Sequence, residues 1–343
     1  MMRRTVSVFA LLVACSAFAP IASALPVTFS ALYNDGAGEG FNDATLGPTR
    51  KSAFEFALNQ IGGLFDRRYA GETVVVRAQF DPLGGTTTSA TLGSAGPSSL
   101  FSGIANAPVA GVYYPTALAN HRQATGVDIN GSTYEIDSTF NSDVDNATVL
   151  GSTNWYYGTN SIPGSNVDFV TVALHELGHG LGFTGFLQSS GAYAFGAVSI
   201  YDNFMNTSSS GGTKLTALGS DAARAAEATG NDLYWDGAVT SFNNGGARPK
   251  LYAPASFSGG SSLYHLDETS LPNELLSPFY SGADHSYSPI ERGMLSDMGW
   301  TLVYVPEAGA LAFGGVASGL ACFAVAAKRQ RKNEKSVRLA ASP

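Results

Sequence analysis

The sequence predicts an α+β protein with a sheet-and-helix N-terminal half and a loop-rich C-terminal half. Three observations lead to this fold class: an amphipathic helical segment near residue 60, β-branched segments on either side of residue 100, and frequent Gly, Ser and Asn after Gly182. No internal repeat is evident, and a hydrophobic content of 44% is enough for a sizeable core. We expect one cleft between the two halves, because ligand sites favour such junctions.

The elements of the first half can be placed in order. Residues 52–64 repeat apolar side chains at helical spacing and predict an amphipathic helix. Residues 73–80, TVVVRAQF, are rich in β-branched side chains and lie between turn formers, so they predict a strand. Residues 134–140 predict a second strand.

A turn dense in oxygen ligands, residues 141–146 (NSDVDN), follows the second predicted strand. These oxygen atoms make Ca2+ a candidate ligand of this turn. The EF-hand pattern fails, however, because Ser152 stands where that loop needs a bidentate Glu. We therefore favour a solvated turn over a calcium site.

Charge and cysteine content exclude several functions. Between Leu25 and Ala327 lie 11 of the 19 Lys and Arg residues but 26 of the 27 Asp and Glu residues. So acidic a surface repels phosphate backbones, which argues against a nucleic-acid partner. Cys15 and Cys322 both lie in terminal apolar segments, so the body has no disulfide and no thiol for metal binding or catalysis.

The N-terminus has the pattern of an export signal. Arg3 and Arg4 precede an apolar run that ends in the small residues ASA at 22–24, which predicts a secretory signal peptide over residues 1–24. A lipoprotein signal is the alternative, because LVAC at residues 12–15 would place a lipid on Cys15. Either interpretation puts the body outside the cytoplasm.

The C-terminus predicts a membrane anchor. Residues 308–327 carry no charge and are long enough to span a bilayer as a helix. The basic residues that follow, beginning at Lys328, should keep the tail at 333–343 cytoplasmic. The arrangement of Val305-Pro306-Glu307, apolar helix and basic end over residues 304–332 resembles the PEP-CTERM sorting signal of Gram-negative bacteria. This resemblance implies an exosortase-type processing partner and a cell-surface or extracellular location.

The stretch VALHELGHGLGF, residues 172–183, carries the strongest chemical signal. It contains His175, Glu176 and His179 in the order H-E-x-x-H. On a helix the apolar residues of this stretch cluster on one face, and the two histidines project from another. We expect Ser165 or Asn166 to cap the start of this helix and Gly182 to end it.

Residues four apart on a helix lie one above the other, so His175 and His179 can bind one zinc ion. Glu176, next to the first ligand, can take the proton of a zinc-bound water and make it a nucleophile towards a peptide carbonyl. A third protein ligand is needed. The pattern that places a third histidine six residues further on finds Gly185 there instead.

HELGHGLGF, together with SLYHLDETSLPNELLSPFY and GMLSDMGW far downstream, resembles the leishmanolysin branch of the metzincin metalloproteases. The resemblance covers about residues 165–185 and 260–303. It implies a metzincin-like zincin domain over residues 25–303 with His265 as the third zinc ligand. It also implies a turn below the metal at residues 274–278, where Leu276 stands in place of the family's methionine.

Two other residues are alternatives to His265. His285 lies in a polar loop, GADHSYSP, and Asp202 could serve if the site used a carboxylate. We interpret His285 as a surface or cleft residue and Asp202 as a turn acid. His121, beside Arg122, is expected to be an ordinary exposed residue.

The sequence therefore predicts a secreted or surface-anchored zinc metalloendopeptidase, a hydrolase of protein or peptide substrates. The alternative is a non-catalytic surface or matrix-binding protein that retains a zincin fold. Glu176 favours the enzyme, because a structural zinc site has four protein ligands and needs no base. A hydrolase of non-peptide amides is a third possibility.

Overall fold

The computed structural model describes residues 25–129, 131 and 133–303. The predicted signal peptide, the sorting segment with its membrane helix and the predicted cytoplasmic tail lie outside these residues. Among the described residues, no helix is both long enough and apolar enough to cross a membrane.

The main sheet has four strands in the order β1-β2-β6-β3. Their bounds are β1 Thr28–Tyr33, β2 Thr73–Asp81, β3 Gly93–Pro97 and β6 Ile136–Asn141. Strands β1 and β6 run parallel to β2, whereas the edge strand β3 runs antiparallel to β6. The two predicted strands correspond to β2 and β6, with boundaries that differ by one or two residues.

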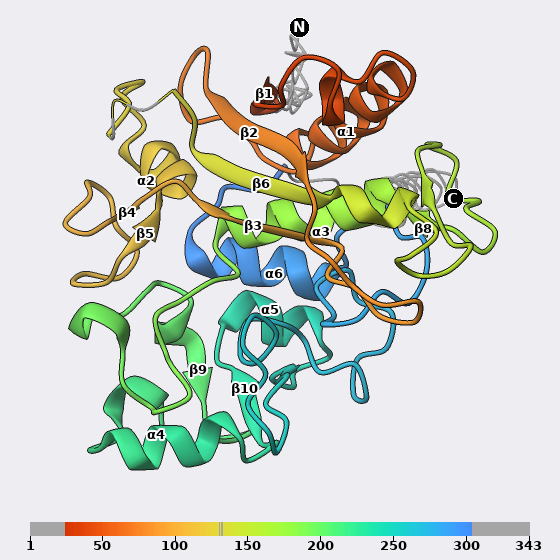
Figure 1. Cartoon of the computed structure of the whole chain (residues 1–343). Helices are drawn as coiled ribbons and strands as arrows, with labels where there is room; N and C mark the ends of the chain where they lie inside the picture. Colours follow the sequence, from red (N-terminus) through yellow and green to blue (C-terminus); the bar gives the residue numbers. More distant parts are fainter. Residues whose placement is uncertain (1–24, 130, 132, 304–343) are drawn as a thin grey trace, which may run out of the picture.

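Six α-helices are present in the described part of the chain (Figure 1). They are α1 Gly47–Gly62, α2 Thr116–Gln123, α3 Phe169–Leu181, α4 Asp221–Ala228, α5 Ala238–Asn243 and α6 Pro289–Met298. The helix predicted at residues 52–64 is α1, and it begins earlier because Pro48 fits the first turn, where its missing N–H costs nothing. Phe54, Ala57 and Ile61 are fully buried, as their spacing predicts.

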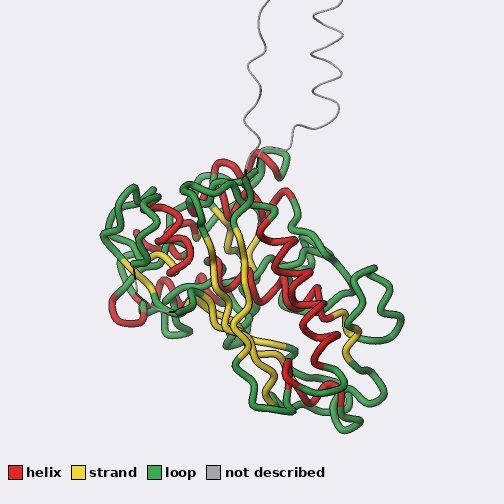
Figure 2. Tube along the Cα trace, turned by 90° about the horizontal axis from the view of Figure 1, so that it is seen from above, coloured by secondary structure: helices red, strands yellow, loops and turns green. Residues whose placement is uncertain are grey.

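Helices α1 and α3 pack against each other, α1 against β1 and α3 against β3 and β6. Viewed from above, the strands run side by side through the molecule with helices alongside them (Figure 2). The rings of Phe140 from β6 and Phe169 from α3 meet edge to face, with centroids 4.8 Å apart. This aromatic packing fixes the first turn of α3 beneath the sheet.

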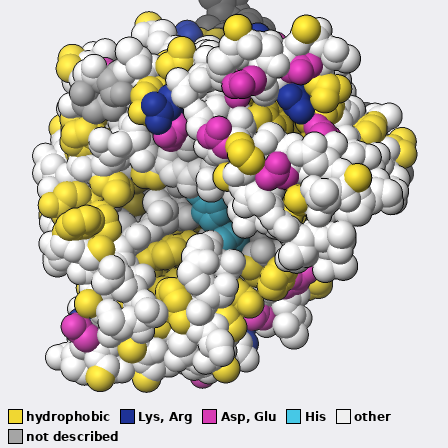
Figure 3. All heavy atoms as spheres, in the orientation of Figure 1, with side chains coloured by type: hydrophobic (Ala, Val, Ile, Leu, Met, Phe, Trp, Pro, Cys, Tyr) yellow, Lys and Arg dark blue, Asp and Glu magenta, His cyan; other side chains and the backbone are white. Residues whose placement is uncertain are grey.

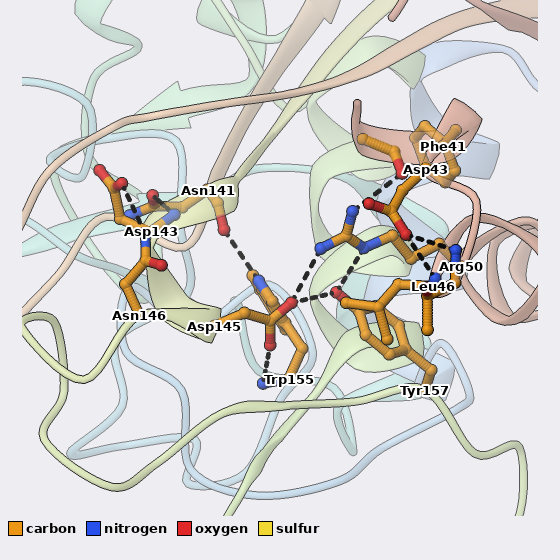
Figure 4. A network of polar contacts seen from close by, with 12 residues as sticks. Phe41, Asp43, Leu46, Arg50, Asn141, Asp143, Asp145, Asn146, Trp155 and Tyr157 are labelled. Atoms are coloured by element: carbon orange, nitrogen blue, oxygen red, sulfur yellow. Dashed lines mark hydrogen bonds and ion pairs between the residues drawn. The ribbon is translucent and has the colours of Figure 1, made fainter. Parts of the chain in front are cut away.

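A polar network ties α1 to the turn after β6 (Figure 4). The buried guanidinium of Arg50 pairs with Asp145 at 2.9 Å and donates a second hydrogen bond to the Tyr157 hydroxyl at 2.9 Å. Asp145 also accepts from Trp155 N, while Asp143 accepts from Gly84 N. These acids belong to the turn considered for calcium. Among the described residues it contributes no cluster of three metal-ligating groups.

The C-terminal half is loop-rich, as predicted. It contains a small sheet of β9 Met205–Asn206, β10 Leu233–Trp235 and β11 Lys250–Leu251. Two further two-stranded sheets lie in the first half: β4 Leu100–Phe101 with β5 Tyr114–Pro115, and β7 Trp155–Tyr156 with β8 Val167–Asp168. Single-turn 3-10 helices connect these elements. The described part of the chain is therefore a mixed α+β structure with small sheets and six helices.

The two ends of the described chain lie beside one segment. Val27 N donates to Phe65 O at 3.1 Å, and Val303 N donates to Leu64 O at 2.8 Å. The entry into β1 and the exit after α6 therefore meet at the loop that follows α1.

Candidate metal centre

Helix α3 presents the H-E-x-x-H motif. Its N-cap is Asp168, whose side chain accepts a hydrogen bond from Thr171 N at 2.8 Å. The predicted caps Ser165 and Asn166 are wrong, because the chain stays extended through β8 and becomes helical only at Phe169. Gly182 ends the helix as predicted, at a φ of 138° that favours glycine.

The structure brings His175, His179 and His265 together. The Nε2 atom of His175 lies 3.2 Å from Nε2 of His179 and 3.2 Å from Nε2 of His265. One nitrogen from each ring falls within a group whose members are all within 4.8 Å of one another. The histidine indicated by the family resemblance thus lies beside the two supplied by the helix.

The hydrogen bonds of the three Nδ1 atoms indicate which nitrogen of each histidine ring carries the proton. Each Nδ1 lies 2.7 Å from a backbone carbonyl: Leu275 O for His175, Phe183 O for His179 and Ser261 O for His265. A carbonyl only accepts, so each Nδ1 carries the proton and each neutral ring directs an Nε2 lone pair inward. Three converging lone pairs repel one another. They suit a cation that accepts all three, and this donor set is typical of zinc.

Burial keeps the three imidazoles neutral. It lowers the pKa of His175 to about 3, helped by the neighbouring His179. It also lowers the pKa of His179 and, well below the usual range, that of His265. The neutral form is the form that binds a metal ion.

Glu176 is buried beside the first ligand, and burial raises the pKa of its carboxyl to about 8. A hydrogen bond from the backbone of Ala95 in β3 lowers this pKa, but by less than burial raises it. Gly93, two residues earlier on the same strand, leaves room for this carboxylate. A Cβ added there would lie 2.9 Å from the Glu176 side chain. Strand β3 therefore both orients Glu176 and makes space for it.

The turn at residues 274–278 supports the histidines from below. Leu276 is fully buried, and its side chain lies 3.0 Å from the position that a Cβ at Gly178 would occupy. Its backbone N donates to Glu291 at 2.6 Å, while Leu275 O holds His175. Leucine thus fills the apolar volume under the helix that carries His175 and His179.

The alternative ligands lie in other contacts. His285 Nε2 bonds to Asp168 at 2.8 Å, at the far end of α3 from His179. Asp202 is fully buried and accepts from Phe186 N and Ser199 N, both at 2.9 Å, so it stabilises a turn. Neither belongs to the histidine group.

The prediction for His121 is wrong. The residue is 0% exposed, and its Nδ1 lies 2.6 Å from a carboxylate oxygen of Glu72. Its Nε2 accepts from Thr301 N at 3.1 Å, and its ring packs on Trp300. It joins α2 to the end of the described chain and lies outside the candidate centre.

A hollow opens near the middle of one face, with histidine side chains visible at its base (Figure 3). His175 and His179 are half-buried, so the centre is reachable from solvent. Hydrophobic side chains gather along the adjoining rim (Figure 3). A polymer could therefore approach the histidines through this opening.

Three contributors to the centre were missed in the sequence. Gly93 and Ala95 act through backbone placement, which leaves no local signal. Glu291 could have been identified from the sequence, because S-P-I-E at residues 288–291 has the capping-box spacing. The structure contains both hydrogen bonds of that box. What the spacing could not reveal is that the same carboxylate also holds Leu276 N.

Residues 76–242 match the model of a family described as SPBPB7E8-like. The match covers slightly less than half of the chain and includes His175, Glu176 and His179, but it ends before His265. No curated protein and no solved structure matches the chain.

Proposed function

We propose that this protein is a zinc-dependent endopeptidase of metzincin type, with His175, His179 and His265 as the metal ligands. The observation that carries the proposal is the convergence of three Nε2 lone pairs beside a buried glutamate. Three histidines leave one position of a tetrahedral zinc site open, as in catalytic rather than structural centres.

The chain's own groups have defined parts in this chemistry. Zinc, when bound, supplies Lewis acidity for a substrate carbonyl and for water. A cation at the three imidazoles favours the ionised form of Glu176, which can then accept a proton from the attacking water. The protonated Glu176 passes that proton to the leaving amine nitrogen. The Ala95 N–H keeps the carboxylate oriented during both transfers.

Glu176→Ala and His265→Ala test the proposal. We expect the purified wild-type protein to hold one zinc per chain and to hydrolyse casein. Glu176→Ala should keep the zinc and lose activity by a factor of at least about 100, because it lacks the base. His265→Ala should lose both zinc and activity. Asp202→Asn, at a buried acid outside the group, should keep the zinc.

The outcomes separate the alternatives. If His265→Ala retains zinc and full activity, the ligand assignment is wrong. If the wild type holds zinc but cleaves neither proteins nor small amides, the non-catalytic binding protein becomes the better proposal. Cleavage of small amides alone would favour the third possibility.

We further propose that the enzyme acts outside the cytoplasm, held at the surface or released through its C-terminal tail. The support is the signal-like pattern before Leu25 and the sorting-like pattern after Tyr304. Comparing the secretion of the full chain with that of a chain lacking residues 305–343 tests the role of the tail.

A further inference from the structure

Three aromatic rings form a cluster, here called the rim cluster: the exposed Phe195 and the half-buried Tyr113 and Phe186. Phe186 meets Tyr113 edge-on with ring centroids 5.8 Å apart, and it meets Phe195 edge-on at 6.2 Å. Phe195 is 96% exposed. The cluster thus presents one fully exposed ring that is backed by two partly buried ones.

The backbone holds Phe195 in place at a conformational cost. Its φ of +59° is a left-handed value that bulky side chains rarely adopt. Such strain persists where the surroundings enforce it, and it concentrates at functional sites. Here Ala194 N bonds to Phe186 O at 2.8 Å, and Arg224 bonds to Gly191 O at 2.7 Å. The segment is therefore a fixed turn that presents one phenylalanine to solvent.

The rim cluster adjoins the candidate metal centre. Phe183 O accepts the hydrogen bond from His179, and Phe186 follows three residues later, at most about 11 Å along the chain. Figure 3 shows hydrophobic side chains along the rim of the hollow, over β4, β5 and the segment after α3. The cluster thus lies within three residues of the carbonyl that holds His179.

We propose that the rim cluster binds a bulky apolar side chain of an extended polypeptide substrate, a few residues from the bond that is cut. This inference rests on the proposed function. An extended chain rises about 3.3 Å per residue, so the span from Phe183 to Phe186 corresponds to about three residues of an extended substrate. The occupant is apolar because the cluster offers aromatic faces and edges, which pack on aromatic and aliphatic side chains.

Peptide binding by the full chain carrying Glu176→Ala tests the inference without cleavage. The probes are fluorescent twelve-residue peptides of one sequence, in which a single Leu is moved along a Ser and Ala background. We expect tightest binding with the Leu at one position, and Phe195→Ala should weaken that peptide about tenfold. Phe195→Leu should restore most of the affinity. An all-Ser and Ala peptide should not distinguish these variants.

Leu32→Ala is the matched control. Leu32 is 40% exposed on β1, the edge of the sheet opposite β3, and its removal should leave all affinities unchanged. The inference is overturned if the Glu176→Ala protein binds every peptide equally well with and without the added Phe195→Ala substitution. If peptides bind with the expected preference but the wild type cleaves none of them, the rim cluster stands and the proposed activity fails. If the wild type cleaves the peptides with no Leu preference, the proposed activity stands and the inference about the rim cluster fails.

Discussion

Glu291 is a buried acid that holds the turn under the candidate metal centre. One carboxylate oxygen accepts from Leu276 N at 2.6 Å and the other from Ser288 N at 2.8 Å. Even with these two bonds, burial raises the pKa of the carboxyl from 4.5 to about 8. The folded state therefore binds a proton at this site at pH values where the unfolded chain has released it.

This raised pKa predicts a pH-dependent stability. The contribution from protonated Glu291 is fully present below about pH 4.5 and is lost as the pH rises through about 8. Between these values the wild type should lose on the order of a few kcal/mol of unfolding free energy relative to Glu291→Gln, which cannot titrate. Urea unfolding of both proteins at pH 5, 6, 7 and 8 measures this difference.

The exposed Glu39 provides the control, since Glu39→Gln should follow the wild type at every pH within about 0.5 kcal/mol. A constant gap between wild type and Glu291→Gln across the range would contradict the assigned protonation.

The residues of the candidate site differ in how far the sequence predicts them. His175, Glu176 and His179 follow from local spacing, and helix geometry alone places them together. His265 came from a family resemblance, because no spacing rule links it to the helix. His121 was misjudged because its burial depends on Glu72 and Thr301, which only the folded chain brings to it.

At the scale of elements, the connection between α1 and the turn after β6 depends on one ion pair. Arg50 is 6% exposed and is the cation that pairs with Asp145, and it also bonds to Tyr157 and Gly40 O. Removing one partner of a buried pair leaves the other charge without compensation. The helix that packs on α3 is thus anchored by a side chain at its N-terminal end.

We therefore expect Arg50→Ala to lower the unfolding free energy by about 3 kcal/mol. The neighbouring Lys51 contacts Asn42 from a less buried position, so Lys51→Ala should change stability by less than about 1 kcal/mol. Thermal and urea unfolding of the two variants measure the contrast. Equal losses would mean that the network contributes little.

Element types were more predictable than their ends. The strands β2 and β6 and the helices α1 and α3 follow from apolar periodicity, because each buries a regular set of side chains. Their boundaries depend on neighbours. Pairing of β7 with β8 keeps residue 167 extended and moves the start of α3 to Phe169. Short strands such as β9, β10 and β11 form only by pairing within their small sheet, so no pattern in the sequence marks them.

At the scale of the whole molecule, the candidate ligands come from both halves of the chain. His175 and His179 lie on α3, whereas His265 lies in the loop-rich half, after β11. An ion bound to all three would cross-link the halves in the folded state only. Binding of this kind stabilises a protein by an amount set by the metal affinity and concentration.

Metal removal should therefore destabilise the entire fold. We expect chelation to lower the unfolding free energy of the wild type by about 4 kcal/mol, the value for free metal at a thousand times its dissociation constant. His265→Ala should unfold near the chelated wild type and respond little to chelator. Calorimetry with and without chelator, followed by zinc re-addition, checks both expectations. A chelator response of equal size in His265→Ala would exclude His265 as the cross-linking ligand.

The meeting of both chain ends at residues 64–65 has a topological consequence. The described body is nearly a closed ring of chain, because β1 enters and the segment after α6 leaves at adjacent backbone positions. A short flexible linker could seal that ring, and new ends could be opened in the exposed loop at residues 209–213. Such a circular permutant would keep the three histidines and their carbonyl partners while reordering which half is synthesised first.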